Sequence, residues 1–126
     1  MIKDFLIVSC IGNNDKLGLR INKDFFIHNL DNNSGNEKLV KEISNLLKLH
    51  KVKLDNNFTV IVNQGPGSFS GTRISLAVVK GLKISKNVKI FGFKNTDLVG
   101  FDQENIEKML KKDLIEKNLI KPIYLS

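Results

Sequence analysis

The sequence has few of the residues that cross-link a chain, bind metals or anchor a protein in a membrane. Its 126 residues include one cysteine, two histidines and no tryptophan. The single Cys10 excludes an internal disulfide and is typical of a reducing compartment. No apolar run approaches the roughly 18 residues that a membrane span needs. The apolar stretch at 5–8 is too short for a signal peptide, so we expect a cytoplasmic protein.

Groups that could catalyse a reaction or ligate a metal are equally sparse. The two histidines fit neither H-x-x-x-H nor H-E-x-x-H, and no C-x-x-C pair occurs. His28 falls in a predicted strand and His50 at the end of a predicted helix, so we interpret both as packing or surface residues. Asp55, Asp97 and Asp102 fall at predicted turns or helix caps. We therefore expect no catalytic residue, no metal site and no cofactor.

Acidic residues are fewer than basic ones, 13 against 20, so the net charge is +7. Such a balance is compatible with nucleic-acid binding. However, nearly all basic residues are lysines, and asparagine and isoleucine are abundant, which is typical of proteins encoded by AT-rich genomes. The lysines are scattered, with local clusters only at 48–53 and 108–112. We expect weak electrostatic help in handling RNA rather than a dedicated RNA surface.

The pattern of apolar residues predicts a single α/β domain. The expected order is strands at 4–12, 16–21 and 24–30, a helix at 37–50, a strand at 58–62, a helix at about 71–85, a strand at 88–93 and a last helix from about residue 103. The first three strands form an antiparallel meander. The strand–helix–strand steps are right-handed crossovers, which pair strands in parallel. This order is that of a ribonuclease H-like domain, the half of the actin-like ATPase architecture, with a mixed sheet and a C-terminal helix.

Polar residues at the helix starts are candidate caps. Ser34 or Asn36 is expected to cap the first helix, Ser68 or Ser70 the second, and Asp102 the last one. Apolar residues then repeat at helical spacing along one side of the last helix. These residues are Ile106, Met109, Leu110 and Leu114.

The stretch VNQGPGSFSGTR at 62–73 resembles a phosphate-binding loop but matches none of three such patterns. A Walker A loop would need glycine where Ser70 stands, followed by lysine. The dinucleotide fingerprint G-x-G-x-x-G is one residue too short for Gly65, Gly67 and Gly71. No serine has the spacing of a nucleophile elbow. Two interpretations stay open, an anion site at a helix start and a tight strand-to-helix turn, and we favour the turn.

The helix after this stretch is apolar on more than one side. A helical wheel gives it a core arc that comprises Ile74, Ala77, Val78, Gly81, Leu82 and Ile84. Leu76 and Val79 lie outside this arc, and Leu49 likewise falls off the apolar face of the preceding helix. Ser75 is small enough for a partner backbone to approach. We favour a protein–protein interface over scattered surface aliphatics or a cover provided by the last helix.

The segment GPGSFSGTRISLAVVKGL at 65–82 closely resembles the signature of the bacterial TsaB (YeaZ) family. Residues 36–64, 88–98 and 121–126 are similar to further parts of that family's pattern. The signature loop consists of Gly65, Pro66, Gly67, Ser68, Phe69, Ser70, Gly71 and Arg73. Two departures stand out. Ser9 and Cys10 replace the family's usual Asp-Thr, which argues against Mg-nucleotide binding, and most of the second ribonuclease H-like half is not found.

The resemblance implies a non-catalytic role without a cofactor. Family members pair with the catalytic subunit TsaD and, through the complex, with the ATPase TsaE. Together they transfer threonylcarbamoyl from threonylcarbamoyl-adenylate to the adenosine beside the anticodon of tRNA, which is contacted indirectly. Family members meet TsaD, or a second copy in a homodimer, through two helices that correspond to 37–50 and 71–85. Carried over, the interface residues are Leu39, Ile43, Leu46, Leu49, Arg73, Ser75, Leu76, Val79, Lys80 and Lys83.

The same comparison divides the chain into two parts of one domain. Residues 1–98 correspond to the family's N-terminal half, and 99–126 form a C-terminal helix and tail. Two alternatives to the accessory subunit stay open. One is a residual nucleotide-binding or hydrolysing enzyme, or an inactive protease-like homologue. The other is a homodimeric scaffold.

Overall fold

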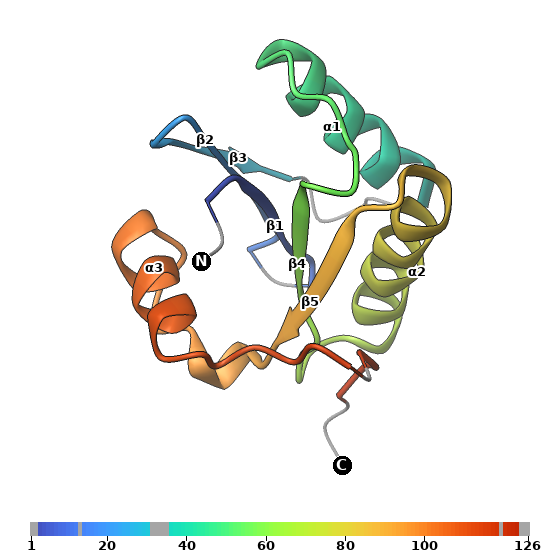
Figure 1. The fold of residues 1–126 in the computed structure, drawn as a ribbon. Coiled ribbons are helices and arrows are strands. Elements are labelled where there is room, and N and C mark those ends of the chain that lie inside the picture. The colour runs from blue at the N-terminus through green and yellow to red at the C-terminus, as the bar shows by residue number, and fades with distance from the viewer. Residues whose placement is uncertain (1–2, 13, 31–35, 119, 124–126) are drawn as a thin grey trace.

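A mixed sheet with helices on both of its faces forms the framework of the protein (Figure 1). The computed structural model describes residues 3–12, 14–30, 36–118 and 120–123. Its elements are β1 (Phe5–Ser9), β2 (Lys16–Ile21), β3 (Asp24–Asn29), α1 (Asn36–Leu49), β4 (Thr59–Asn63), α2 (Phe69–Lys86), β5 (Lys89–Phe93), the 3₁₀ turn η1 (Asn95–Asp97) and α3 (Gln103–Lys111). No helix within these ranges is long and apolar enough to cross a membrane.

The strand order is β3-β2-β1-β4-β5. β1, β2 and β3 pair antiparallel, whereas β4 pairs in parallel with both β1 and β5. In register, Leu6 of the central strand β1 lies between Leu19 of β2 and Val60 of β4. Figure 1 shows α1 and α2 against one face of the sheet and α3 against the other. The mixed sheet and the predicted order of elements are therefore confirmed.

Two apolar cores occupy the two faces because successive side chains of a strand point to opposite sides. Leu6 and Val8 of β1 belong to the larger core, which α1 and α2 cover. Phe5 and Ile7 belong to the smaller core, which includes Ile106 and Met109 of α3. A strand that is apolar at every position, as at residues 5–8, therefore indicates a strand covered on both faces, and this expectation is confirmed.

β1 ends at Ser9, three residues before the predicted boundary. The chain leaves the sheet after Ser9, and the Ile11 carbonyl oxygen accepts a hydrogen bond from the Ser68 N–H at 2.7 Å. Gly12 has a φ of 95° and its N–H donates to Asp15 Oδ1 at 2.9 Å. Tertiary pairing with the glycine-rich stretch thus replaces the last part of the expected strand.

The predicted helix ends agree with the structure to within a few residues. Asp102 caps α3, because its carboxylate accepts the Asn105 N–H at 2.8 Å. Asn36 is the first residue of α1 rather than its cap, and Ser34 lies outside the described residues. Leu114 was expected on the apolar side of the last helix, but α3 ends at Lys111 and Leu114 is exposed. The expected extended tail is described only as far as residue 123.

The core-facing side of α2 is shifted around the helix relative to the predicted arc. Val78 of that arc is buried, and Ile74 and Leu82 pack against the larger core, as predicted. Leu76 and Val79 are 3% and 0% exposed, whereas Ile84 of the predicted core arc is 86% exposed. The wheel failed because two polar residues lie on the buried side. The Thr72 hydroxyl donates to the Ser68 carbonyl at 2.7 Å, and the Ser75 hydroxyl to the Thr72 carbonyl at 3.0 Å. These bonds to the helix backbone satisfy both hydroxyls, so they can be buried.

The observed orientation of α2 predicts how two truncation variants differ in their free energy of unfolding. We expect Leu76→Ala to lower the free energy of unfolding by about 2–5 kcal/mol, because it leaves a cavity in the larger core. Ile84→Ala should change it by no more than about 0.5 kcal/mol, because the side chain is exposed. Urea unfolding followed by circular dichroism measures both values. The reverse ranking would restore the predicted arc.

Candidate functional site

The glycine-rich stretch forms a tight turn that joins β4 to α2 and contacts the loop after β1. A Cβ atom at Gly67 would lie 2.4 Å from the Cβ of Ile11, and one at Gly71 would lie 2.7 Å from Ser68 Oγ. Real Cβ atoms do not approach so closely. Gly67, where a Cβ atom would also lie 2.8 Å from the Ile11 carbonyl oxygen, requires glycine, whereas a side chain at Gly71 would displace the Ser68 hydroxyl. Ser68 caps α2, because its Oγ accepts the Gly71 N–H at 3.1 Å. The favoured interpretation as a strand-to-helix turn agrees with this geometry.

Asn63, the last residue of β4, holds the turn to two neighbouring segments. Its Oδ1 accepts the Gly65 N–H at 2.9 Å. Its Nδ2 donates to Ser9 Oγ at 3.0 Å and to Asn95 Oδ1 at 3.1 Å. The side chain is fully buried. Sequence reasoning missed this residue, although an asparagine directly after a buried apolar run was a usable signal.

The turn offers little that would hold a phosphate. The N–H groups of Gly65, Ser68 and Gly71 already donate to atoms of the chain. The buried Asp15 beside Gly12 adds negative charge next to the turn. Among the described residues, no group of three or more histidine, cysteine, aspartate or glutamate side chains is placed to hold a metal ion. The open alternative of an anion site at this helix start therefore has no supporting observation.

The remaining signature residues differ in their exposure. Gly65 is buried, Pro66 is half-buried and Ser70 is exposed. Phe69 is exposed, and the Arg73 guanidinium lies over its ring, with Cζ 4.9 Å from the ring centroid. This cation–π contact gives Arg73 a partner within the chain, which the sequence did not reveal.

Most of the predicted interface residues are not at the surface. Buried in the core between the helices and the sheet are Leu39, Ile43, Leu46, Ser75, Leu76 and Val79. These residues hold the chain together and have no surface to offer a partner, so this part of the predicted interface is wrong. Exposed are Leu49, Arg73, Lys80 and Lys83.

Leu49 lies on the side of α1 that faces away from α2. Glu42, seven residues earlier and so on nearly the same side of the helix, has its Oε2 2.5 Å from Nε2 of His28 in β3. That side of α1 therefore faces the sheet edge formed by β3. Val40 lies on the opposite flank of the buried side, toward α2, and is half exposed. Val40 rather than Leu49 is therefore placed to contribute to a surface shared by the two helices.

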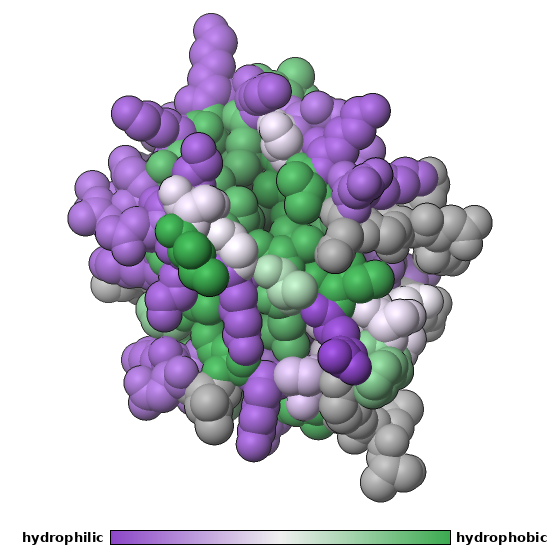
Figure 2. All heavy atoms as spheres, turned by 90° about the vertical axis from the view of Figure 1, so that its right-hand side faces the viewer, coloured by the Kyte–Doolittle hydropathy of each residue, from purple (hydrophilic) through white to green (hydrophobic). Residues whose placement is uncertain are grey.

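The outer side of α2 carries an unbroken row of small and apolar residues. Ile74, Ala77, Gly81 and Ile84 follow one another at intervals of three and four residues, which places them on one side of the helix. Ala77, Gly81 and Ile84 are exposed, and a Cβ atom at Gly81 would meet nothing within 4 Å. We call these four residues and Val40 the outer apolar stripe. In Figure 2, which faces these two helices, hydrophobic side chains gather in a central band among hydrophilic ones.

Basic side chains border the outer apolar stripe. Arg73 and Lys80 lie within four residues of Ala77 along α2, and both are exposed. Lys41 and Lys48 are exposed on α1, where the acidic residues are Glu37 and Glu42. A partner with an apolar patch and acidic surroundings would complement this face.

The sequence is similar to curated proteins of one kind, although no family model matches it. It is 28% identical over 104 residues to the tRNA threonylcarbamoyladenosine biosynthesis protein TsaB of Buchnera aphidicola subsp. Schizaphis graminum, covering 80% of this chain and 49% of the relative. It is 34% identical over 70 residues to the protein of the same name from Buchnera aphidicola subsp. Baizongia pistaciae, covering 56% and 32%. The chain thus spans about half, or less, of the length of these relatives.

Solved structures share the fold. YeaZ from Pseudomonas aeruginosa superimposes with a TM-score of 0.68 at 19% identity, over 76% of this chain and 46% of that one. A second structure, an uncharacterized protein with similarity to peptidase YEAZ from the same organism, gives the same score over 45% of its length. This similarity shows a ribonuclease H-like fold, as the element order predicted.

The thiol beside the turn should be inert. Burial, and to a smaller extent the nearby Asp15, raises the pKa of Cys10 from 9.0 to about 12. At pH 9 we therefore expect iodoacetamide to leave Cys10 unmodified in the native chain and to alkylate it on the order of a hundredfold faster in denaturant. Because the pKa of the thiol is higher in the folded chain than in the unfolded one, its contribution to the free energy of unfolding is complete below pH 9. This contribution is lost progressively as the pH rises toward 12. Rapid alkylation of the native chain, measured by mass spectrometry, would contradict the buried placement.

Proposed function

The chain is a homologue of the TsaB (YeaZ) family and matches the N-terminal part of its members, and from this premise we propose that it is a non-catalytic accessory subunit. In this proposal it binds and stabilises a TsaD-like catalytic protein in the synthesis of threonylcarbamoyladenosine in tRNA. It forms a heterodimer in the cytoplasm, meets a TsaE-like ATPase through the complex and serves tRNA indirectly. Residues 1–98 provide the partner-binding half, and α3 of the remaining part packs on the opposite face of the sheet.

The observation that carries this proposal is the outer apolar stripe. Ile84 is 86% exposed, Val40 is half exposed, and a Cβ atom at Gly81 would meet nothing within 4 Å. Covering an aliphatic side chain of this size contributes roughly 1.5–3 kcal/mol. Small residues between the larger ones allow another backbone to come close. A face of this kind is suited to a partner that buries it, and the related proteins are named for a biosynthetic pathway rather than for a single catalytic site.

Several observations at the turn support a role without catalysis. Three backbone donors of the turn, the N–H groups of Gly65, Ser68 and Gly71, donate to atoms of the chain itself. Cys10 is a buried thiol whose raised pKa makes it a poor nucleophile. Where the family pattern has aspartate, Ser9 accepts a hydrogen bond from Asn63. Calorimetric titration with MgATP tests the enzyme alternative, and saturable binding would contradict this part of the proposal.

A charge placed in the stripe should break the heterodimer without unfolding the chain. We expect Ile84→Glu to weaken binding to the TsaD-like protein of the same organism by about tenfold or more, because the carboxylate would be buried without a partner. Co-expression, size-exclusion chromatography and calorimetry measure the complex. The matched control is Val99→Glu, since Val99 is 92% exposed but lies between η1 and α3. The buried Leu76 and Val79 are unsuitable for this test, because a charge there would unfold the chain.

Two outcomes would overturn the proposed interface. Equal weakening by Ile84→Glu and Val99→Glu would mean that the stripe is not the contact. If Ile84→Glu dissociates a homodimer of the isolated chain and no complex with the TsaD-like protein forms, the homodimeric scaffold is favoured instead. Light scattering of the isolated chain separates these results.

Gly81 provides a second test, in which stability and binding change in opposite directions. A glycine in the middle of an exposed helix costs about 1 kcal/mol relative to alanine. We therefore expect Gly81→Ala to raise the free energy of unfolding of the isolated chain by about 0.5–1 kcal/mol. It should weaken the complex by about fivefold, because the added methyl group obstructs a closely packed partner backbone. Thermal unfolding and calorimetry give the two values, and unchanged affinity would place Gly81 outside the contact.

A further inference from the structure

A second surface lies in the layer of α3, away from the outer apolar stripe. A cleft of about 960 Å³ opens where the parallel strands begin, opposite the end of the sheet that carries the glycine-rich turn. Phe5, Thr59 and Lys89, the first residues of β1, β4 and β5, line it together with the last turns of α3. The family comparison and the proposed function assign no role to this cleft.

The cleft has an apolar floor with an aromatic ring. Leu110 and Ile115 line it and pack against the smaller core. Phe91 of β5 also lines it and is half-buried. Its neighbours in the same strand, Ile90 and Gly92, belong to the opposite face of the sheet by alternation. A half-buried ring at the floor of a polar cleft is a surface on which a flat group can stack.

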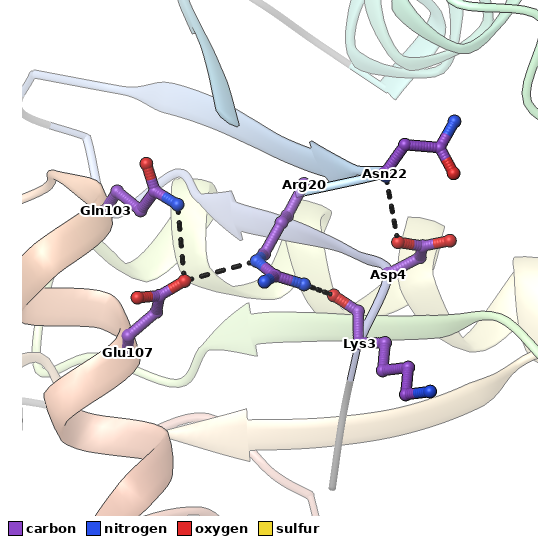
Figure 3. Close-up of polar contacts among 6 residues, drawn as sticks. All are labelled: Lys3, Asp4, Arg20, Asn22, Gln103 and Glu107. Carbon is purple, nitrogen blue, oxygen red and sulfur yellow. Dashed lines mark hydrogen bonds and ion pairs between the residues drawn. The ribbon is translucent and has the colours of Figure 1, made fainter. Parts of the chain in front are cut away.

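The acidic residues of the cleft are all engaged by other groups of the chain. Arg20 Nε lies 3.2 Å from Glu107 Oε1, and the same arginine donates through Nη1 to the Lys3 carbonyl oxygen (Figure 3). Asp4 Oδ1 accepts the Asn22 N–H at 3.2 Å. Two further ion pairs engage the other acidic residues. Lys108–Glu104 lies within α3 at 3.2 Å, and Lys117–Asp113 lies just after this helix at 3.1 Å.

Three lysines of the cleft are left over. Lys3, Lys89 and Lys111 are exposed and form no ion pair with any residue that the structure describes. They come from the segment before β1, the start of β5 and the end of α3. Figure 3 shows the Lys3 side chain extending away from the Arg20–Glu107 pair. The fold therefore gathers unpaired positive charge that the sequence presents as scattered lysines.

We propose that this cleft binds a short single-stranded segment of RNA. Its phosphates contact Lys3, Lys89 and Lys111, and one unpaired base stacks on Phe91. Positively charged grooves with an aromatic platform are a recurrent way of holding single strands. The net charge of +7 and the pI of about 9.6 favour the approach of a polyanion. A duplex keeps its bases paired and cannot place one on a ring at the floor of a cleft.

The test is a titration of the full chain into a fluorescein-labelled oligouridylate of about ten nucleotides, followed by anisotropy at several salt concentrations. We expect Lys89→Gln with Lys111→Gln to weaken binding about tenfold and to reduce the slope of log K against log salt by about 0.7 for each phosphate that is no longer neutralised. Phe91→Leu should weaken binding about fivefold with an unchanged slope, since it removes stacking and no charge.

The control removes the same charge from the other layer of the molecule, through Lys80→Gln with Lys83→Gln on α2. We expect the affinity of this variant for the oligonucleotide to lie within about twofold of that of the unchanged chain, because charge lost from the other layer weakens only nonspecific attraction. Circular dichroism checks that every variant is folded. All substituted lysines are exposed, so their replacement leaves both cores intact.

Five results would overturn the proposal. An equal loss of affinity in the control variant would mean diffuse attraction of RNA to a basic protein. Unchanged affinity in Phe91→Leu, or equal affinity for duplex RNA, would exclude the stacked base. Equally tight binding of a glutamate-rich peptide would assign the cleft to an acidic protein segment. No anisotropy change at low salt would exclude an RNA site. None of these results depends on whether the chain binds a TsaD-like protein.

Discussion

Backbone-to-backbone contact between the glycine-rich turn and the loop after β1 is the constraint on which the rest of the structure depends. The Ser68 N–H donates to the Ile11 carbonyl, and the space beside Ile11 admits no side chain at Gly67. Asn63 adds hydrogen bonds to the turn, to β1 and to η1. The same contact ends β1 early and sets the start of α2. Glycine-rich loops at helix starts often bind anionic ligands, whereas this one hydrogen-bonds to other segments of its own chain.

The start of α2 in turn decides which of its two apolar sides is left for a partner. Once Ser68 caps the helix, Leu76 and Val79 meet the sheet, and Ala77 and Ile84 are turned outward. The buried Thr72 and Ser75 are tolerated because their hydroxyls bond to carbonyls of the same helix. Val78 lies on the core side as predicted, Leu76 and Val79 lie there as well, and Ala77, Gly81 and Ile84 face outward. The proposed heterodimer therefore depends on Ile84 and its neighbours.

The sheet separates two surfaces of different chemistry. The outer apolar stripe on α1 and α2 is suited to a protein with an apolar patch, whereas the cleft beside α3 combines an aromatic floor with unpaired lysines. Their separation by a sheet buried on both faces means that substitutions on one side leave the other intact. An accessory subunit with two such faces could hold a catalytic partner on one and a nucleic-acid strand on the other.

The sequence by itself determined the element order, the mixed sheet and the cap at Asp102. It narrowed the cap of α2 to Ser68 or Ser70 and favoured a turn for the glycine-rich stretch. These features follow from local periodicity, turn chemistry and crossover rules, which act over a few residues. Only the tertiary structure decided the inward side of α2, the hydrogen bonds of Asn63 and the meeting of Lys3, Lys89 and Lys111. Periodicity cannot rank two apolar sides of one helix, because burial depends on which side the sheet covers. Residues far apart in sequence become neighbours only through strand pairing, which composition does not encode.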